Sequence, residues 1–401
     1  MDDVLRLVNA HDAWRGRDCI NLQPSENVTS PAVRRILASD LGHRYTLPGR
    51  DPDGEPRNDY GGTRFLDEAE AFGESLAREV FGAAHATLRP LSGHVAGLLA
   101  LLATCRRGDT IMVIDSRHGG YDGYTPKYLP DMLGLRATFL PFDESRWTVD
   151  AERAAHAILE ARPRLVLLGG SLIVFPYNLR WLRGACDDVG ALLAYDGSHV
   201  LGLLAGGEFQ RPLDEGADLL FGSTHKSFFG PQGAILLANR DDVFGRALEN
   251  LTWRAIDNAH WNRVAATAQA LAEAKAFGSA YARQVVANAQ ALGAQLEKWG
   301  VPVKFAALGY TRSHQVLLDP RRLETDWGLG FASLSQRLEA NNLIVDRTGR
   351  IGTAEVTRMG AREEEMQDLA ALIARAARGQ DVRPEVAEVR ARLKLSYAFG
   401  D

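Results

Sequence analysis

The stretch RLVLLGGSLIVFPYNLRWLRGACDDVGALLAYD, residues 164–196, contains two apolar runs separated by a helical pattern. RLVLLGG (164–170) and ALLAYD (191–196) each have the length and apolar character of a buried strand. The segment at 178–190 places its apolar residues at helical spacing. A strand, a helix and a second strand in this order predict a crossover connection, and therefore a mainly parallel sheet with helices on both faces.

The same alternation extends in both directions from this stretch. Further strands are predicted at 111–115, 137–142, 218–223 and 233–239, with a further helix at 149–162. The run at 233–239 follows the run at 218–223 too closely for a helical crossover, so these two are expected to pair antiparallel. The sequence therefore predicts an open α/β sheet in which one pair of neighbouring strands is antiparallel.

The length of 401 residues exceeds the usual size of one compact core, so we expect a large domain and a smaller one. A long alanine-rich helical pattern at 262–277 leads from the sheet to a second, smaller α/β pattern. The boundaries that we predict are an N-terminal arm at 1–40, a large sheet domain at 41–260, a connecting helix at 261–285 and a small C-terminal domain at 286–401.

Composition narrows the class of protein. Apolar residues make up 46% of the chain and charged residues 24%, as in a soluble globular protein. The net charge of −5 and the absence of a dense basic patch argue against nucleic-acid binding. No apolar run is long enough to span a bilayer, and the N-terminus does not resemble a leader. The three cysteines, Cys19, Cys105 and Cys186, lack metal-ligand spacing, which predicts a reduced, cytoplasmic protein without a metal site.

Lys226 is the first candidate for chemistry. It lies in FGSTHKSFFG (221–230), among small and apolar residues, in a chain that has six lysines and forty arginines. It follows the strand predicted at 218–223, and active sites of open α/β sheets form at the carboxyl ends of the strands. Burial there would lower the pKa of the amine and favour a Schiff base with an aldehyde cofactor. Taken alone, however, Lys226 is better explained as a surface lysine after a strand.

Asp196 makes the lysine more informative. It ends the strand at 191–196, and His199 follows three residues later. Pyridoxal phosphate needs an acidic partner on its pyridine nitrogen, because the protonated ring is the electron sink. A single aspartate at a strand end more often forms a turn or caps a helix. An aspartate and a lysine about thirty residues apart on the same edge are more specific, and together they indicate pyridoxal phosphate.

Two further positions complete the predicted site. Ser92 and Gly93 begin a helical apolar run, where free backbone N–H groups and the helix dipole favour a phosphate. A plain serine N-cap explains that position about equally well. His118 follows another strand end, in DSRHGGYDG, where an imidazole could stack on a planar ring. A histidine at such a place is more often structural, so its assignment depends on the other residues.

With these elements in order, the chain resembles the serine hydroxymethyltransferase family of fold-type I pyridoxal-phosphate enzymes. The most specific stretches are DGSH (196–199) and STHK (223–226), with AGGEF between them. The likeness begins at NLQPSENVTSPAV (21–33) and ends at TGRIGTAEVTRMG (348–360). The resemblance implies a large domain with a mostly parallel, seven-stranded sheet, a smaller C-terminal α/β domain, and a homodimer with shared active sites.

The resemblance also assigns roles at the cofactor. Lys226 is implied as the Schiff-base lysine, Asp196 as the partner of the pyridine nitrogen, and His118 as the residue stacked on the ring. The full set of residues that it implies for binding pyridoxal 5'-phosphate is Ser92, Gly93, His94, His118, Ser171, Asp196, His199, Ser223, His225 and Lys226. The implied catalytic residues are Lys226, His118, Tyr45 and His225.

For the substrate, the resemblance implies Arg350 as the clamp for an α-carboxylate, since a guanidinium fork binds a carboxylate bidentately. Ser25 matches a position that lines the substrate site, as does Ser171. Tyr45 and Tyr60 match two tyrosines that the family usually offers to the active site of the neighbouring subunit. The expected partners are therefore a small amino-acid substrate and a second copy of the chain, with no nucleic acid or membrane.

Several positions depart from the family. The family has a glutamate two residues after the tyrosine that matches Tyr45, and this chain has Leu47. A family glycine pair ahead of the long helix corresponds to Asp257-Asn258. A leucine cannot transfer a proton, and general acid–base groups typically contribute ~10²–10⁴-fold. Glu55, in the insert after Tyr45, is a weaker candidate to replace the missing carboxylate.

We therefore expect an enzyme that breaks the Cα–Cβ bond of a β-hydroxy-α-amino acid through a glycyl quinonoid, as an aldolase or transaldolase that does not use folate. The first alternative is serine hydroxymethyltransferase activity with tetrahydrofolate and an altered base. A racemase, aminotransferase or decarboxylase reaction at Cα stays open, because fold does not determine reaction type. A non-catalytic binding protein is disfavoured by the presence of Lys226, Asp196, His118 and Arg350 together.

Overall fold

The computed structural model describes residues 3–50 and 56–400. Glu55 therefore lies outside the described residues. The chain forms two compact units, of which unit 1 comprises residues 1–28 and 280–398 and unit 2 comprises residues 29–279 and 399–401. The predicted domain boundaries differ from this division mainly at the N-terminus, because Ile20 and Asn21 pair with Leu343 and Ile344 and so belong to unit 1.

Unit 2 is built on a seven-stranded sheet of order β4-β12-β11-β10-β9-β5-β6. Its strands are β4 (His85–Thr87), β5 (Thr110–Val113), β6 (Arg136–Phe139), β9 (Leu165–Gly169), β10 (Leu192–Asp196), β11 (Leu219–Ser223) and β12 (Ala234–Ala238). Only β12 runs against the other strands of this sheet, since it pairs antiparallel with both β11 and β4. The predicted fold class, a mostly parallel α/β sheet with an antiparallel pair at 218–239, is confirmed.

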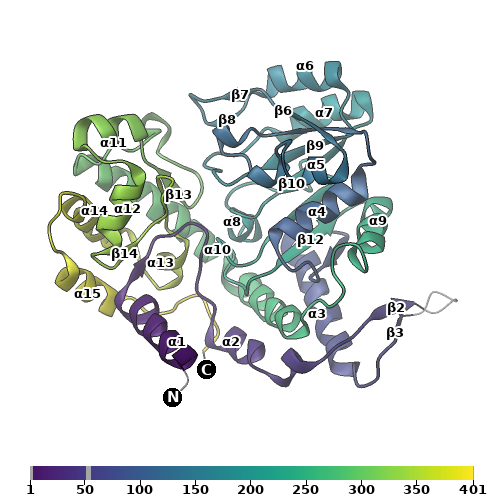
Figure 1. Ribbon diagram of the computed structural model, residues 1–401, viewed down its shortest axis with the longest axis horizontal. Coiled ribbons are helices and arrows are strands. Elements are labelled where there is room, and N and C mark those ends of the chain that lie inside the picture. Colours follow the sequence, from purple (N-terminus) through teal and green to yellow (C-terminus); the bar gives the residue numbers. More distant parts are fainter. Residues whose placement is uncertain (1–2, 51–55, 401) are drawn as a thin grey trace. The chain divides into compact units, whose positions relative to one another are not determined.

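Most helices of unit 2 lie around this sheet, whereas α2 lies apart from it (Figure 1). They are α2 (Pro31–Leu37), α3 (Arg64–Phe81), α4 (Gly93–Thr104), α5 (Leu129–Leu133), α6 (Ala151–Ala161), α7 (Leu179–Val189), α8 (Leu201–Ala205) and α9 (Asp241–Leu251). Two short ladders, β2 (Pro48–Arg50) with β3 (Pro56–Asn58) and β7 (Phe142–Asp143) with β8 (Thr148–Val149), lie outside the main sheet. Beyond His94, helix α4 is almost entirely apolar, which suits its packing on β10, β11 and β12 and its cover by α9.

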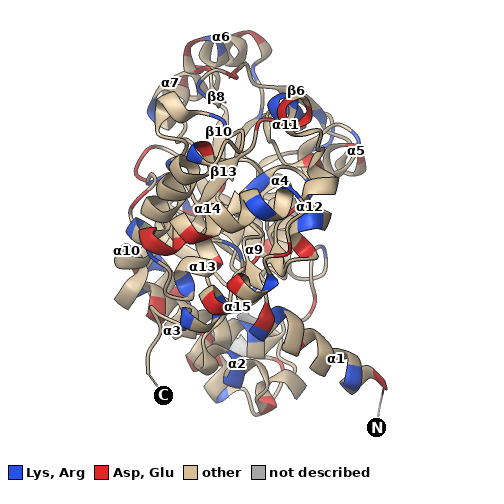
Figure 2. Ribbon diagram, turned by 90° about the vertical axis from the view of Figure 1, so that its left-hand side faces the viewer, with Lys and Arg blue, Asp and Glu red and all other residues tan. Residues whose placement is uncertain are grey.

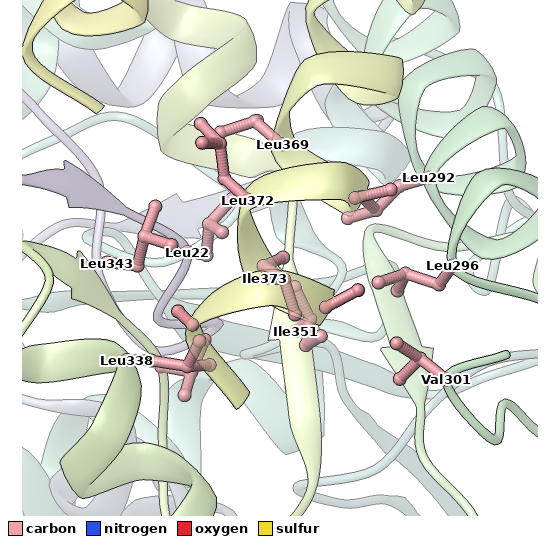
Figure 3. Packing of buried hydrophobic residues seen from close by; sticks show 14 of the residues in the cluster. Leu22, Leu292, Leu296, Val301, Leu338, Leu343, Ile351, Leu369, Leu372 and Ile373 are labelled. Carbon is pink, nitrogen blue, oxygen red and sulfur yellow. The ribbon is translucent and has the colours of Figure 1, made fainter. Parts of the chain in front are cut away.

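The helix α10 (Trp261–Lys298) contributes residues to both units, and it extends beyond the connecting helix predicted at 261–285. The other elements of unit 1 are α1 (Asp3–Ala13), β1 (Ile20–Asn21), β13 (Gln315–Leu317), α11 (Pro320–Trp327), α12 (Phe331–Glu339), β14 (Leu343–Ile344), β15 (Arg350–Gly352), α13 (Ala354–Arg358), α14 (Glu363–Ala377) and α15 (Arg383–Arg392). Its core packs Leu22, Leu292, Leu338, Ile351 and Ile373 together (Figure 3).

Charged residues of both signs are interspersed along the helices in the view of Figure 2. Among the described residues, no helix is both long and apolar enough to cross a membrane. Within the same residues, no group of three or more His, Cys, Asp or Glu side chains is arranged to hold a metal ion. All three cysteines have free thiols.

Candidate active site

The carboxyl ends of the central strands bring the predicted residues to one edge of the sheet. Asp196, the last residue of β10, pairs in register with Gly169 of β9 and Phe221 of β11. Gly169 has a φ of +118°, and a Cβ there would lie 2.3 Å from the carbonyl oxygen of Asp196. Only glycine permits this approach, so the apolar strand β9 ends in glycine where the site begins.

A cavity opens at this edge and holds about 320 Å³ of space that protein atoms do not fill, including its mouth. It is lined by Gly93, His94, Tyr121, Gly170, Ser171, Asp196, Ser198, His199, Ser223 and Lys226. The structure thus gathers seven of the predicted cofactor residues in one cavity within unit 2. The predicted residues Ser92, His118 and His225 do not line it.

Lys226 is positioned by the loop between β11 and β12. This loop is closed by hydrogen bonds from the Thr224 backbone N–H to the Gly233 carbonyl and from the Gly230 N–H to the Thr224 carbonyl. The backbone of Gly202 packs against Ser227, where a Cβ on Gly202 would lie only 2.2 Å from the Ser227 carbonyl oxygen. Lys226 Nζ lies 3.3 Å from His199 Nε2, so the half-buried amine shares a hydrogen bond with an imidazole.

Asp196 is a buried carboxylate, 5% exposed, that receives hydrogen bonds from two neutral donors. The Tyr124 hydroxyl donates to Oδ2 at 2.8 Å, and the Ser198 backbone N–H donates to Oδ1 at 2.9 Å. No arginine or lysine among the described residues forms an ion pair with it. Buried Glu70, by contrast, is matched by Arg89 at 2.6 Å. Because buried charges are normally paired, Asp196 is suited to a cation bound in the cavity.

The cavity also contains a site for an anion, which lies where α4 begins. Gly93 is the first residue of this helix, and its N-terminal N–H groups favour an anion. A Cβ on Gly93 would lie 2.4 Å from Ser223 Oγ and 2.9 Å from Ser198 Oγ, so glycine allows both hydroxyls to approach the helix end. Ser92 Oγ accepts the Val95 N–H at 3.2 Å and is the N-cap of the helix. The N-cap explanation of Ser92 therefore holds in this structure.

An aromatic side chain lines the cavity at Tyr121, three residues beyond the predicted His118. The Tyr121 hydroxyl lies 3.0 Å from His94 Nδ1, which joins two residues that line the cavity. His118 instead stacks on Phe142 with ring centroids 4.7 Å apart, and its Nε2 lies 3.0 Å from Glu144 Oε1. The structure does not place His118 among the residues that line the cavity, whereas the aromatic side chain of Tyr121 does line it.

His225 precedes Lys226 but is not among the residues that line the cavity. Burial, and then the positive charge of Lys226, lowers the pKa of its imidazole to about 4. Its buried Nδ1 has no hydrogen-bond partner among the described residues. The imidazole is therefore neutral at physiological pH, and it adds no second positive charge beside Lys226.

The predicted substrate residues fall in both units. In unit 1, Arg350 begins β15, and its Nε donates to Asp346 Oδ2 at 2.5 Å while both side chains are nearly buried. Ser25 lies in a turn of the same unit. In unit 2, the Tyr45 hydroxyl donates to Asp257 Oδ2 at 2.7 Å, and the rings of Tyr45 and Tyr60 meet edge to face at 4.9 Å. Neither tyrosine lines the cavity that contains Lys226.

The comparisons with known proteins decide the family. Residues 1–373 match the family described as serine hydroxymethyltransferase. The chain belongs to the serine hydroxymethyltransferase family. It is 40% identical to a serine hydroxymethyltransferase of Methanothermobacter thermautotrophicus, over 100% of this chain and 96% of the relative. It is 37% identical to one of Pyrococcus abyssi, over 92% of this chain and 88% of the relative.

A solved structure of L-threonine transaldolase from Pseudomonas fluorescens, in its internal aldimine state, is also similar. The TM-score is 0.88 at 25% identity, covering 99% of this chain and 93% of that one. As a member of the serine hydroxymethyltransferase family, the protein is a pyridoxal-phosphate enzyme of amino-acid metabolism with the fold-type I architecture.

The residues of this cavity fit pyridoxal phosphate. Buried Asp196 has no cationic partner among the described residues and would meet the pyridine nitrogen, and Lys226 supplies an amine for the aldehyde. Gly93 lets the hydroxyls of Ser198 and Ser223 approach the N-terminus of α4, where a phosphate would bind. A carboxylate, an amine and an anion site line a single cavity, which matches the three polar groups of the cofactor.

Some side chains of this site, those of Tyr121, Tyr124 and Ser198, were not identified from the sequence. Tyr121 and Tyr124 follow His118 in DSRHGGYDGY, and Ser198 lies between Asp196 and His199 in DGSH. Each is close to a predicted residue, so closeness in sequence was a usable signal. The positions of Tyr121 and Tyr124 depend on turns of 3₁₀ helix at 116–118 and 122–124, and that of Ser198 on the turn after β10, none of which a periodicity indicates.

Proposed function

We propose that this protein breaks or forms the Cα–Cβ bond of a β-hydroxy-α-amino acid without folate, as an aldolase or transaldolase. When bound, pyridoxal phosphate stabilises negative charge at Cα, which is the chemistry that this reaction needs. Lys226 would bond covalently to the cofactor aldehyde, and Asp196 would hold a proton at the pyridine nitrogen. Arg350 would bind the substrate carboxylate, and Asp346 would orient its guanidinium through Nε.

The observation that carries the folate-independent assignment is Leu47. Its backbone is held in place by two hydrogen bonds, one from its own N–H to Asn58 Oδ1 at 3.2 Å and one from the Asp59 N–H to its carbonyl at 3.3 Å. A half-buried hydrocarbon therefore has a defined place where the family has a glutamate. Without that carboxylate, proton transfer during one-carbon exchange with folate loses its expected acid–base group.

The similarity to an L-threonine transaldolase supports the same assignment. In such a reaction, an aldehyde leaves the first amino acid and a different aldehyde is captured in its place. Neither step moves a one-carbon unit to a folate, so neither requires a glutamate at position 47. The identity of the substrate side chain would be determined by the segments around Tyr45 and Leu172, which differ from the family pattern.

The proposal is tested by following aldehyde release from L-threonine, L-serine and α-methylserine, with and without tetrahydrofolate. We expect release without folate from at least one of the three substrates, followed by exchange with an added aldehyde if the enzyme is a transaldolase. Turnover of serine only in the presence of folate would contradict the proposal. If the cofactor binds but no aldehyde appears, the reaction is a different one at Cα, such as racemisation or transamination.

The variants Leu47→Glu and Leu47→Gln test the assignment at the deciding residue. Glutamate restores a carboxylate and glutamine is its uncharged isostere, so only Leu47→Glu should gain folate-dependent turnover of serine. Since a positioned acid–base group contributes about 10²–10⁴-fold, even partial restoration would be measurable. An equal response of the two variants would mean that position 47 does not handle the proton.

Serine hydroxymethyltransferase activity is the second candidate, and one contact favours it. The Asp257 carboxylate lies 2.7 Å from the Tyr45 hydroxyl, beside the position of the missing glutamate. It could take over proton transfer, and the curated relatives carry the name serine hydroxymethyltransferase. In that case, Asp257→Asn would abolish the folate-dependent reaction and leave any folate-independent cleavage unchanged.

We further propose that the enzyme is a homodimer whose active sites are shared. Tyr45 and Tyr60 do not line the cavity of their own chain. The same unit exposes Phe65, Phe72 and Trp253, which are 71%, 62% and 74% exposed. Exposed apolar side chains of this size favour a protein partner, and a second copy of the chain would cover them.

Mixing two inactive variants tests shared sites. If Tyr45 serves the neighbouring site, a heterodimer of Lys226→Ala with Tyr45→Ala contains one intact site. Random mixing should then restore about one quarter of the native activity, because half of the dimers are heterodimers with one working site of two. If the mixture stays as inactive as its components, each site is complete within one chain.

A further inference from the structure

Tyr124 contacts Asp196, a residue of the candidate active site, and no role has yet been assigned to it. It is 2% exposed, and its hydroxyl donates to Asp196 Oδ2 at 2.8 Å. Burial, and then the charge of Asp196, raises the pKa of the Tyr124 phenol well above its usual value. The phenol therefore keeps its proton at any physiological pH, and it remains a hydrogen-bond donor to the carboxylate.

The position of this hydroxyl is enforced by helix α4. A Cβ on Gly97 would lie 2.4 Å from the Tyr124 oxygen, so α4 has a glycine at the turn that meets the phenol. On its other side, the Tyr124 ring packs edge to face against Tyr121, with centroids 5.1 Å apart. Tyr124 thus lies behind the carboxylate, between α4 and a residue that lines the cavity.

The two donors to Asp196 have a consequence for any proton on the cofactor ring. A proton between a carboxylate and a pyridine nitrogen can reside on either atom, and the total number of protons is the same in both cases. Hydrogen bonds to the carboxylate stabilise its charged form and so favour the proton on nitrogen. The Ser198 N–H is a backbone donor at Oδ1, whereas the Tyr124 hydroxyl is a side-chain donor at Oδ2 that a substitution can remove.

We propose that Tyr124 is a positioning residue that keeps the shared proton on the pyridine nitrogen of the cofactor and off Asp196. This inference rests on the proposed role of Asp196 as the partner of that nitrogen. The protonated ring accepts electrons from Cα more readily than the neutral ring. Tyr124 would therefore raise the electron-accepting ability of the cofactor through its hydrogen bond to Asp196, without touching cofactor or substrate.

The test is the 15N NMR signal of the ring nitrogen in holoenzyme loaded with 15N-labelled pyridoxal phosphate, since this signal reports protonation of the nitrogen directly. Tyr124→Phe should shift the signal toward that of an unprotonated pyridine. Loss of one hydrogen bond to a charged group should change the partition of the proton by roughly tenfold. Gly97→Ala, which keeps the phenol but displaces it, should shift the signal in the same direction.

Tyr195→Phe is the matched control. Tyr195 is also buried, it neighbours Asp196 on β10, and its hydroxyl makes one hydrogen bond, to Gln210 Oε1 at 3.0 Å. This variant should leave the ring-nitrogen signal unchanged. An equal shift in Tyr124→Phe and Tyr195→Phe would overturn the inference, because loosening of the fold would then explain both.

Asp196→Asn separates the inference from the proposal on which it rests. If this variant alters the signal and Tyr124→Phe does not, Asp196 is the partner of the nitrogen and the role of Tyr124 is refuted. If Asp196→Asn leaves the native signal, the assignment of Asp196 itself fails, and the inference fails with it. A shift of the signal in both Asp196→Asn and Tyr124→Phe, with none in Tyr195→Phe, supports the inference that Tyr124 acts on the cofactor through Asp196.

Discussion

The protein contains two tyrosine–aspartate pairs with the same chemistry in opposite surroundings. In Tyr124–Asp196 the hydroxyl donates at 2.8 Å inside the sheet domain, and in Tyr45–Asp257 it donates at 2.7 Å at the surface. The distances are almost equal, but water competes for the second pair and cannot reach the first. Burial therefore makes the first pair a fixed structural element, whereas the second can open and reform as its surroundings require.

This difference separates two kinds of function. An aspartate that must hold one proton in one place benefits from a dry and rigid setting. A residue that serves a neighbouring subunit or a variable substrate benefits from freedom to move. If the two pairs divide in this way, substitutions at the buried pair and at the surface pair should have different effects.

The largest difference is expected when each aspartate is removed. Asp196→Ala should lower kcat/KM for the best substrate by about 10²–10³-fold, the usual effect of losing one preorganised electrostatic group. Asp257→Ala, as the matched change at the surface, should lower it less. Steady-state kinetics at saturating cofactor measure both. Equal losses would show that burial does not distinguish the pairs.

An intermediate effect is expected from crowding the buried pair. In Gly97→Ala, the new methyl group would overlap the Tyr124 hydroxyl, which should reduce the free energy of unfolding by about 1–3 kcal/mol. Gly184→Ala is the control, because Gly184 is an exposed position of α7 with no atom near an added Cβ. That change should stabilise the protein by up to about 1 kcal/mol. Urea unfolding of both variants measures the contrast, and loss of stability in Gly184→Ala would invalidate it.

The smallest effect concerns the titration of the surface pair. The hydrogen bond to Asp257 raises the pKa of Tyr45 to about 12. Because the neutral phenol is favoured, the stabilisation from this pair is present below pH 10 and is lost as the pH rises through about 12. Asp257→Asn should move one tyrosine titration toward pH 10, as followed by ultraviolet absorbance. An unchanged titration curve would mean that solvent has already replaced the hydrogen bond.

The residues that could be predicted from the sequence share a physical property. Asp196 and Ser223 end the apolar strands β10 and β11, and Lys226 follows β11 closely. Parallel strands bring their carboxyl ends to one edge of the sheet whatever the connecting helices contain. A run such as LLAYD therefore carries information about the position of the residue that ends it. The short strand β4 (His85–Thr87) was not predicted, because three residues cannot show an apolar pattern.

The residues that could not be predicted depend on irregular backbone. His118 and Tyr121 lie in the same loop, three residues apart. From residue type alone, the histidine is predicted to stack on the cofactor ring. The structure turns Tyr121 to the cavity and pairs His118 with Glu144, and neither outcome is visible in a hydrophobic pattern. Likewise, the ion pair between Arg350 and Asp346 follows from a turn at 346–349 that a search for a free arginine does not detect.

One feature of the cavity rim bears on how such enzymes diverge. The loops after β5 and β9 are joined through their backbones, since the N–H groups of Ser171 and Leu172 both donate to the Gly119 carbonyl and Gly120 bridges to Gly170. A Cβ on Gly170 would lie 2.2 Å from the Gly119 oxygen, so neither loop can be rebuilt without the other. In evolutionary terms, a change in the backbone of one loop therefore requires a matching change in the other. New substrate preferences would arise when both loops change together, or when side chains such as Tyr121 change while the backbone of the two loops is kept.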